Sequence, residues 1–321
     1  MIRKHDRNRL AGALAALFIL AAVAAPALAE DKFEEKFAKT EALAKNGKLY
    51  LGNVSGQIEV MTWKEAQVKI EAVKTSKAKS PEKAKENAAL VTIEVTKDGD
   101  LVRVETKYPK KSGGSWGGEG ISVSVDYKVW VPDQAAVEIK SISGDVEVAA
   151  LGGKAKIDSV SGNVGLRGAA GAEVKLVSGD LEMEKVAGDA FIKGISGNIR
   201  VRGVKGSVGA DCVSGDIELR EVSGAASVDV KTVSGNVTYA GTIEAGGRYE
   251  LKTHSGDVRM SAPAAAGFDF EANTFSGAID SEFDIAVVGK ISSREIRGTV
   301  GKGGATVVLK SFSGNVDLKK I

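Results

Sequence analysis

The sequence predicts an all-β protein built as a parallel β-solenoid, a single-stranded β-helix of about nine rungs with ~18–21 residues each. Ser-Gly pairs recur along the chain, and from Ser143 to Ser276 they lie 17 to 21 residues apart. Most pairs are followed by Asp or Asn and then by apolar residues two apart, which is the pattern of a short half-buried strand. Because all these strands carry their apolar residues in the same phase, stacking them as rungs buries every apolar face together. We expect the coil to be right-handed.

Residues 1–29 have the features of a signal peptide. Residues 1–9 are basic, Leu10 to Ala25 are apolar or small, and Ala27-Leu28-Ala29 precedes Glu30 as a small-x-small cleavage site. The alternative is an uncleaved membrane anchor, since the apolar stretch is long for a signal peptide. No later stretch approaches the ~18 apolar residues that a membrane span needs. We therefore expect export to the periplasm or the cell surface of a bacterium.

Charge and cysteine content argue against a nucleic-acid-binding protein and against a fold held by disulfides. Residues 1–29 hold four of the 44 basic and one of the 42 acidic side chains, so the remaining chain is close to neutral. It has no global positive field that would attract nucleic acid. Cys212 is the only cysteine, which excludes an internal disulfide, so packing must stabilise the fold.

Residues 30–135 are expected to form a β-rich N-terminal cap that is continuous with the solenoid. Residues 47–73 contain alternating strands around Ser55-Gly56-Gln57. Ser80 and Pro81 are typical of a helix start, so a short helix is expected to about Ala89. Residues 92–107 resemble a hairpin with a turn at Asp98-Gly99-Asp100, and residues 121–131 are apolar at every odd position.

Residues 136–321 are expected to form the repeat domain. Its corners need glycine because glycine adopts positive φ without a Cβ clash, while Ser and Asp or Asn can bond to the backbone of a turn. An apolar residue precedes each Ser in most repeats, and Lys319-Lys320 would protect the last edge strand. The predicted structural turn residues are Ser143, Gly144, Asp145, Ser161, Gly162, Asn163, Ser178, Gly179, Asp180, Ser196, Gly197, Asn198, Ser214, Gly215, Asp216, Ser234, Gly235, Asn236, Ser255, Gly256, Asp257, Ser313, Gly314 and Asn315.

Three segments carry a resemblance to a known family: NVSGQIEV near the start, ISVSVDYKVWVP, and GKGGATVVLKSFSGNVDL at the end. Together with the serial VSGD and VSGN units they resemble a bacterial "putative adhesin" family, a β-strand-repeat domain of unknown function. The resemblance covers about residues 33–321. It implies a β-solenoid envelope protein without an established activity, and it supplies no catalytic residues.

The corner acids and amides could be ligands instead of turns. Calcium needs six to eight oxygen ligands, usually with several carboxylates, whereas half of the corner residues are neutral amides. A polysaccharide-cleaving β-helix would need carboxylates that converge on one cleft, and here they are spread one per rung. His254 occupies the apolar slot before Ser255 and is interpreted as a core or rim residue, and Cys212 as a small core residue. We predict no catalytic residue, no metal site and no cofactor.

The segment 109–120, PKKSGGSWGGEG, is the candidate partner-binding site. Trp116 lies in a glycine-rich loop after Lys110 and Lys111, where an aromatic ring can stack on a sugar or anchor a partner. The alternative is a connection with an incidental Trp.

The expected function is that of an exported, non-catalytic cell-envelope protein, an adhesin-like binding or scaffolding module. Its partner would be an envelope component, protein or glycan, and self-association is a further expectation. The alternatives are a glycan-active enzyme on a β-helix scaffold, and a structural or stress-sensing component that binds itself or a membrane regulator.

Overall fold

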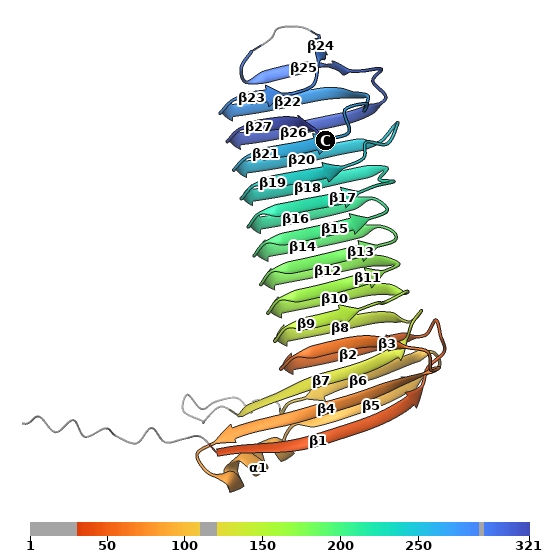
Figure 1. Cartoon of the computed structure of the whole chain (residues 1–321). Coiled ribbons are helices and arrows are strands. Elements are labelled where there is room, and N and C mark those ends of the chain that lie inside the picture. Colours follow the sequence, from red (N-terminus) through yellow and green to blue (C-terminus); the bar gives the residue numbers. More distant parts are fainter. Residues whose placement is uncertain (1–30, 110–120, 289–291) are drawn as a thin grey trace, which may run out of the picture.

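The computed structural model describes residues 31–109, 121–288 and 292–321. The predicted signal peptide, residues 1–29, lies outside the described residues, as do Lys110, Lys111 and Trp116. The described chain is all-β apart from one helix, and its strands form two long sheets (Figure 1). This confirms the predicted all-β, solenoid-like fold with parallel strands.

Each rung places one strand in each sheet. The 14-stranded sheet, called sheet B, runs in the order β24-β25-β22-β26-β20-β18-β16-β14-β12-β10-β8-β2-β6-β5, and the 13-stranded sheet A runs β1-β4-β7-β3-β9-β11-β13-β15-β17-β19-β21-β27-β23. The rung strands of sheet B are β2 (Lys48–Ser55), β8 (Ala136–Ser143), β10 (Lys154–Ser161), β12 (Gly171–Ser178), β14 (Ala190–Ser196), β16 (Val208–Ser214), β18 (Ser227–Ser234), β20 (Arg248–Ser255), β26 (Ala305–Ser313) and β22 (Phe268–Ser276). Those of sheet A are β3 (Ile58–Trp63), β9 (Val146–Ala149), β11 (Val164–Ala169), β13 (Leu181–Val186), β15 (Ile199–Val204), β17 (Ile217–Val222), β19 (Val237–Gly241), β21 (Val258–Ala262), β27 (Val316–Lys320) and β23 (Ile279–Ser281).

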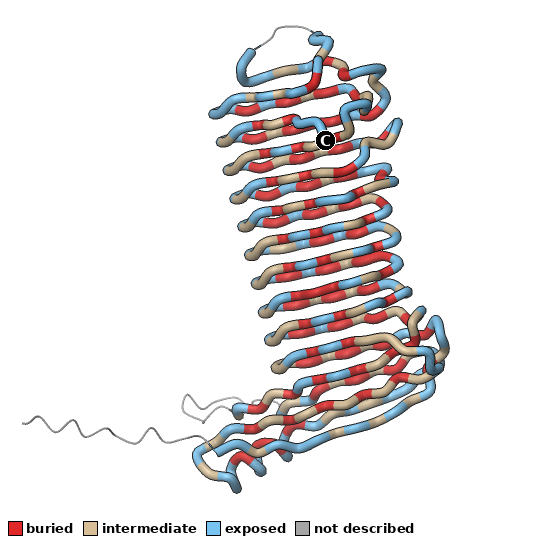
Figure 2. The backbone as a smooth tube through the Cα atoms, viewed as in Figure 1, coloured by how far each residue is buried: buried red, intermediate tan, exposed pale blue. Residues whose placement is uncertain are grey.

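The core lies between the two sheets and follows from period-two alternation. On β12 the side chains of Ala172, Val174 and Leu176 are buried. The register places like residues on one another, since Val174 pairs with Ile157 of β10 and with Ile192 of β14. Buried and exposed residues alternate along every rung (Figure 2). The apolar ladders that the sequence predicts therefore form one continuous core.

The N-terminal part of the chain forms both the first rung of the stack and the cap that covers this rung. Strands β2 and β3 pair in parallel with β8 and β9, so residues 48–63 belong to the stack although they lie within the range 30–135 expected for the cap. Beyond them, β7 (Ser122–Pro132), β4 (Gln67–Ala78) and β1 (Asp31–Ala42) extend sheet A. The hairpin β5 (Thr92–Asp98) and β6 (Leu101–Lys107) extends sheet B. Helix α1 (Pro81–Ala89) begins as predicted, because Ser80 Oγ accepts a hydrogen bond from the Lys83 N–H (3.2 Å).

The C-terminal rung does not lie at the end of the stack. Strand β26 pairs with β20 on one side and with β22 on the other, so Ser313 stacks between Ser255 and Ser276. The chain first forms the outer rung β22–β23, continues through β24 (Ile285–Val287) and β25 (Glu295–Val300), and then returns. The expectation that Lys319-Lys320 protects the last edge strand is therefore wrong. Both residues lie in β27, which is flanked by β21 and β23.

Candidate binding surface

The corners between sheet B and sheet A show why Ser-Gly-Asp or Ser-Gly-Asn recurs. Gly179 has φ +126°, a conformation that residues with a Cβ rarely adopt. A Cβ at this position would also lie 2.1 Å from the carbonyl oxygen of Gly162 in the neighbouring rung. Both the backbone angle and the close stacking therefore require glycine, and the same holds at the other corners from Gly144 to Gly256 and at Gly314. At Gly277 only the close stacking requires it.

The Asp and Asn residues form a hydrogen-bonded ladder along the corners. The backbone N–H of Asn198 donates to Asp180 Oδ1 (2.7 Å), and that of Asp180 donates to Asn163 Oδ1 (3.0 Å). The ladder also includes Asp145, Asp216, Asn236, Asp257 and Asn315. Both an amide oxygen and a carboxylate oxygen can accept this bond, so either Asp or Asn can occupy each position of the ladder. Within the described residues, no group of three or more His, Cys, Asp or Glu side chains could hold a metal ion.

An exposed row of apolar side chains runs beside these corners along sheet B. We call it the apolar stripe, and it consists of the residue before each corner Ser: Ile142, Val160, Val177, Ile195, Val213, Val233, Phe312 and Phe275, with His254 in the same row. Between 43% (Val177) and 63% (Phe275) of each apolar residue is exposed. The neighbouring residue on the inner face is buried, as Leu176 is beside Val177. The stripe is therefore outside the core and available to a partner.

Sequence reasoning missed the exposure of this row. The available signal was a break in alternation, because Leu176-Val177 places two apolar residues side by side and only one of them can face the core. At several other corners the inner position is filled by Ser141, Ser159, Thr232 or Thr253, which made the apolar residue next to it resemble the core position.

The C-terminal end of the stripe is aromatic. The rings of His254 and Phe312 are stacked, with centroids 4.7 Å apart, and those of Phe312 and Phe275 are stacked at 4.8 Å. The structure thus places His254 at the rim of the rod and not in the core. Cys212 is buried, as expected, and its burial raises the pKa of the thiol.

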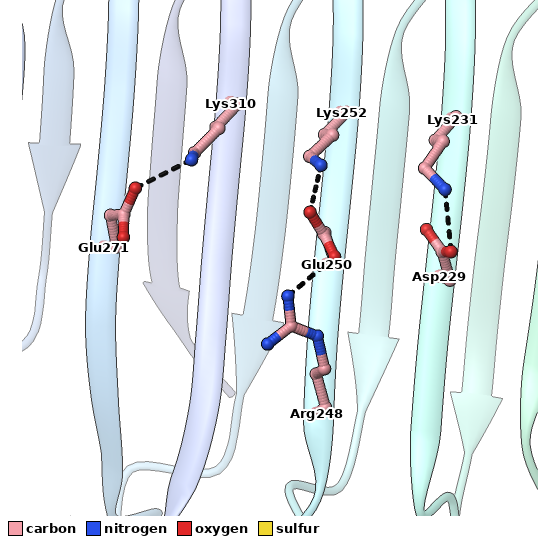
Figure 3. A network of polar contacts seen from close by, with 7 residues as sticks. All are labelled: Asp229, Lys231, Arg248, Glu250, Lys252, Glu271 and Lys310. Carbon is pink, nitrogen blue, oxygen red and sulfur yellow. Dashed lines mark hydrogen bonds and ion pairs between the residues drawn. The ribbon is translucent and has the colours of Figure 1, made fainter.

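A row of lysines lies on the same face, two residues before the stripe. Its members are Lys140, Lys175, Lys193, Lys231, Lys252 and Lys310, and Asp158 and Asp211 interrupt it. Several of these lysines form ion pairs with carboxylates two residues further from the stripe (Figure 3). We call these carboxylates the acidic row; it consists of Glu138, Glu173, Asp229, Glu250 and Glu271, and Lys156, Phe191, Gly209 and Val308 interrupt it. Lys231 Nζ lies 2.7 Å from Asp229 Oδ2, and Lys310 Nζ lies 2.7 Å from Glu271 Oε1. The hydrogen bond from Lys310 lowers the pKa of Glu271, and the bond to Asp229 raises the pKa of Lys231.

Part of the stripe forms the floor of a groove of about 660 Å³. The groove crosses β2, β6, β8, β10, β12 and β14, and its lining includes Ile142, Val160, Val177 and Ile195. Ser141 and Ser159 also line it, and their buried hydroxyls have no hydrogen-bond partner among the described residues. The groove therefore combines an apolar floor with unused hydrogen-bonding groups and a charged margin. The margin contains Lys107, Lys140, Lys175 and Lys193 together with Glu105 and Asp158.

The fold and this surface together define a β-solenoid that carries an extended, exposed apolar stripe with a groove over part of it. The family model named Toastrack DUF4097 matches residues 47–319. The chain therefore belongs to the Toastrack DUF4097 family, which agrees with the resemblance to a bacterial adhesin-like family of unknown function. No helix in the described parts of the chain is long and apolar enough to cross a membrane.

The chain is similar to several solved structures from bacteria. A "putative adhesin" from Bacteroides fragilis NCTC 9343 is 11% identical, with 88% of this chain and 97% of that chain covered and a TM-score of 0.33. A "putative lipid binding protein" from Parabacteroides distasonis ATCC 8503 is 11% identical, with 89% and 96% covered and a TM-score of 0.35. A "putative adhesin" from the same organism is 12% identical, with 89% and 97% covered and a TM-score of 0.30. No curated protein matches the chain.

Proposed function

We propose that the protein is an exported, non-enzymatic module of the bacterial cell envelope that binds an amphiphilic envelope component along the apolar stripe. The observation that carries the proposal is the stripe itself, in which rung after rung exposes a Val, Ile or Phe beside the same corner. Stacking the rungs does not require these side chains, because the core is complete without them. Contiguous exposed apolar surface is typical of a binding site.

The rigidity of the rod supports a binding role. The stripe is fixed by parallel strand pairing on both sides and by the ladder of Asp and Asn at the adjacent corners. A surface that is already ordered loses little conformational entropy when a ligand binds. Right-handed coiling and about nine rungs of ~18–21 residues stay predictions from the sequence.

The absence of catalysis is part of the proposal and is supported by how the corner acids are used. Asp145, Asp180, Asp216 and Asp257 each accept a backbone N–H from the next rung. Glycoside hydrolysis needs a pair of carboxylates placed across one scissile bond. The corner carboxylates are instead spread along the rod and tied to its backbone.

Binding to envelope fractions tests the proposal. The protein from residue 30 onward is incubated with peptidoglycan, outer-membrane lipid and whole cells, as wild type, as the double variant Val177→Asp/Ile195→Asp, and as Trp116→Ala. Leu90→Asp is the matched control, since Leu90 is also exposed (52%) but lies at the end of α1 in the cap. We expect saturable binding that only the stripe variant loses.

Other outcomes have definite meanings. Loss of binding in Trp116→Ala alone would move the site to the segment 109–120. Binding that survives all variants, or no binding to any fraction, would overturn the proposed function.

A further inference from the structure

We infer that the component bound by the apolar stripe is an anionic lipid bilayer, on which the rod lies lengthwise. The inference rests on the proposed function and identifies its ligand. It is drawn from the order of three parallel rows on the outward face of sheet B: the apolar stripe, the lysine row, and the acidic row.

The first step is the shape of the surface. Strand spacing of about 4.8 Å places the stripe along the whole stack, over a length of about 45 Å. Figure 1 shows the rungs stacked in one direction, so the rows follow the long axis of the rod. A long, narrow row of half-exposed apolar side chains matches an extended partner better than a small molecule enclosed in a pocket.

The second step is the position of the charges. Each lysine lies two residues from the stripe on the same strand face, or about 6.6 Å along the strand. The acids with which these lysines pair, such as Glu173, Asp229 and Glu250, lie two residues further away. A lysine therefore separates the stripe from most of the acids. When the apolar stripe is inserted into a bilayer, the lysine side chains beside it reach the level of the lipid phosphates.

The third step is that the lysines can change partners. In the pair Lys175–Glu173, 48% and 44% of the two side chains remain exposed. Exposed ion pairs contribute little to stability, so exchanging the carboxylate for a phosphate costs little. On the other side of the stripe lie the exposed corner serines, which are uncharged. The carboxylates of the corner ladder lie beyond these serines, two residues further along the chain, and each accepts a backbone N–H of the next rung.

The fourth step concerns the groove. Its volume of about 660 Å³ lies over Ile142, Val160, Val177 and Ile195, where acyl-chain segments would displace water from apolar surface. The unpartnered hydroxyls of Ser141 and Ser159 line the same groove and can donate to ester oxygens of a lipid. Apolar and polar features of the groove thus match the two parts of one lipid molecule.

Vesicle co-sedimentation tests the inference. The protein from residue 30 onward is mixed with vesicles of phosphatidylcholine, with and without phosphatidylglycerol, at low and high salt. We expect binding to the anionic vesicles that weakens with salt, and weaker binding to phosphatidylcholine alone. Val177→Asp/Ile195→Asp and Lys175→Glu/Lys193→Glu should each lower the partition coefficient by about tenfold or more.

Two matched controls and a folding check accompany these variants. Leu90→Asp makes the same kind of change outside the stripe, and Arg200→Glu/Arg202→Glu makes the same charge reversal on exposed positions of sheet A. Both should bind anionic vesicles like the wild type. Circular dichroism melting identifies any variant that loses the fold, and for such a variant the milder Val177→Ser/Ile195→Ser replaces the Asp pair.

Three results would overturn the inference. The first is no vesicle binding, or equal binding to neutral and anionic vesicles. The second is a dimer in sedimentation equilibrium that the stripe variants abolish without any vesicle binding, which would make a second copy the partner. The third is stripe-dependent binding to lipid-free peptidoglycan only, which would retain the proposed function and reject the lipid. Loss of stripe dependence in every fraction would reject both.

Discussion

At the scale of single residues, the side of the rod opposite the Ser-Gly corners contains a column of left-handed backbone positions. The column consists of Ala150, Gly168, Lys185, Gly203 and Glu221, with φ between +55° and +78°. Each lies in the same place in its rung, as a residue skipped by the strand pairing. The left-handed conformation costs a residue with a Cβ roughly 1–2 kcal/mol, so the three non-glycine positions carry strain that the two glycines avoid.

Exchanging residue types within this column should change stability in opposite directions. Lys185→Gly is expected to raise the free energy of unfolding by about 1 kcal/mol, and Gly203→Ala to lower it by about 1–2 kcal/mol. A Cβ at Gly203 would meet nothing closer than 3.6 Å, so the loss there comes from the backbone angle alone. Urea denaturation of both variants measures the effect. If Lys185→Gly proved destabilising, the column would not be under strain.

At the scale of elements, a buried hydrogen-bonded chain joins the cap to the first rung. Thr106 of β6 donates to Asn53 Oδ1 of β2 (3.0 Å), so Tyr127 of β7 is the donor in its 2.7 Å bond with Thr106. Asn53 Nδ2 in turn donates to the carbonyl of Val125 (2.8 Å). Burial raises the pKa of Tyr127 to about 12. The hydrogen bonds that join β2, β6 and β7 therefore depend on the protonated phenol of Tyr127.

This junction makes stability depend on pH in the alkaline range. Below pH 10 Tyr127 is protonated in both states and contributes no slope. Between pH 10 and about 12 the unfolded chain loses the proton while the folded chain keeps it, so the free energy of unfolding falls by about 1.4 kcal/mol per pH unit for this residue. Tyr127→Phe should lower stability near pH 7 by about 1 kcal/mol and reduce the slope above pH 10.

Urea titrations of the two proteins from pH 8 to 12 measure this difference. Lysines that titrate in the same range affect both proteins equally and cancel in the comparison. Tyr108, Tyr239 and Tyr249 also have raised pKa values because of burial, so a residual slope is expected in the variant. An unchanged slope in Tyr127→Phe would contradict the assignment.

The elements also show how far sequence reasoning reaches. Helix α1, the β5–β6 hairpin and the alternation within each rung depend on local patterns, and the sequence predicted them. The stripe depends on which of two adjacent apolar residues faces inward, and a local pattern leaves that open at Leu176-Val177. The order of the rungs depends on pairing between near-identical repeats, because β20 offers the same ladder to β22 as to β26. Only long-range packing decides between such partners.

At the scale of the whole molecule, spatial order departs from chain order at both ends. Strand β2 lies between β6 and β8, and β26 lies between β20 and β22. At each end of the rod, neighbouring strands therefore come from segments that are far apart in the sequence. Since each rung contacts only its neighbours, the two ends are independent of each other.

Removing residues 305–321 should open the C-terminal end while leaving the other rungs intact. Strand β22 would lose its parallel partner and β20 would become an edge, so the amides of both should exchange rapidly with solvent. Strands β8 to β14 should keep their protection. Hydrogen exchange followed by mass spectrometry compares this truncation with removal of Ile321 alone, an exposed residue. Full protection of β20 in the longer truncation would show that β22 can take the place of β26.

Strands β26 and β27 follow β22 and β23 in the sequence but lie inside them in the stack, which affects how the rod can assemble during synthesis. Synthesis delivers the chain from its N-terminus, and the rungs from β8–β9 to β20–β21 can stack in that order. In the final strand order the outer rung β22–β23 pairs with β26 and β27, so it reaches that position only after residues 305–321 have been made. A chain cut short by a premature stop or a protease would present an open strand edge, which quality-control proteases and chaperones detect. Residues 305–321 thereby decide whether β20 is paired on both sides or lies at an open edge.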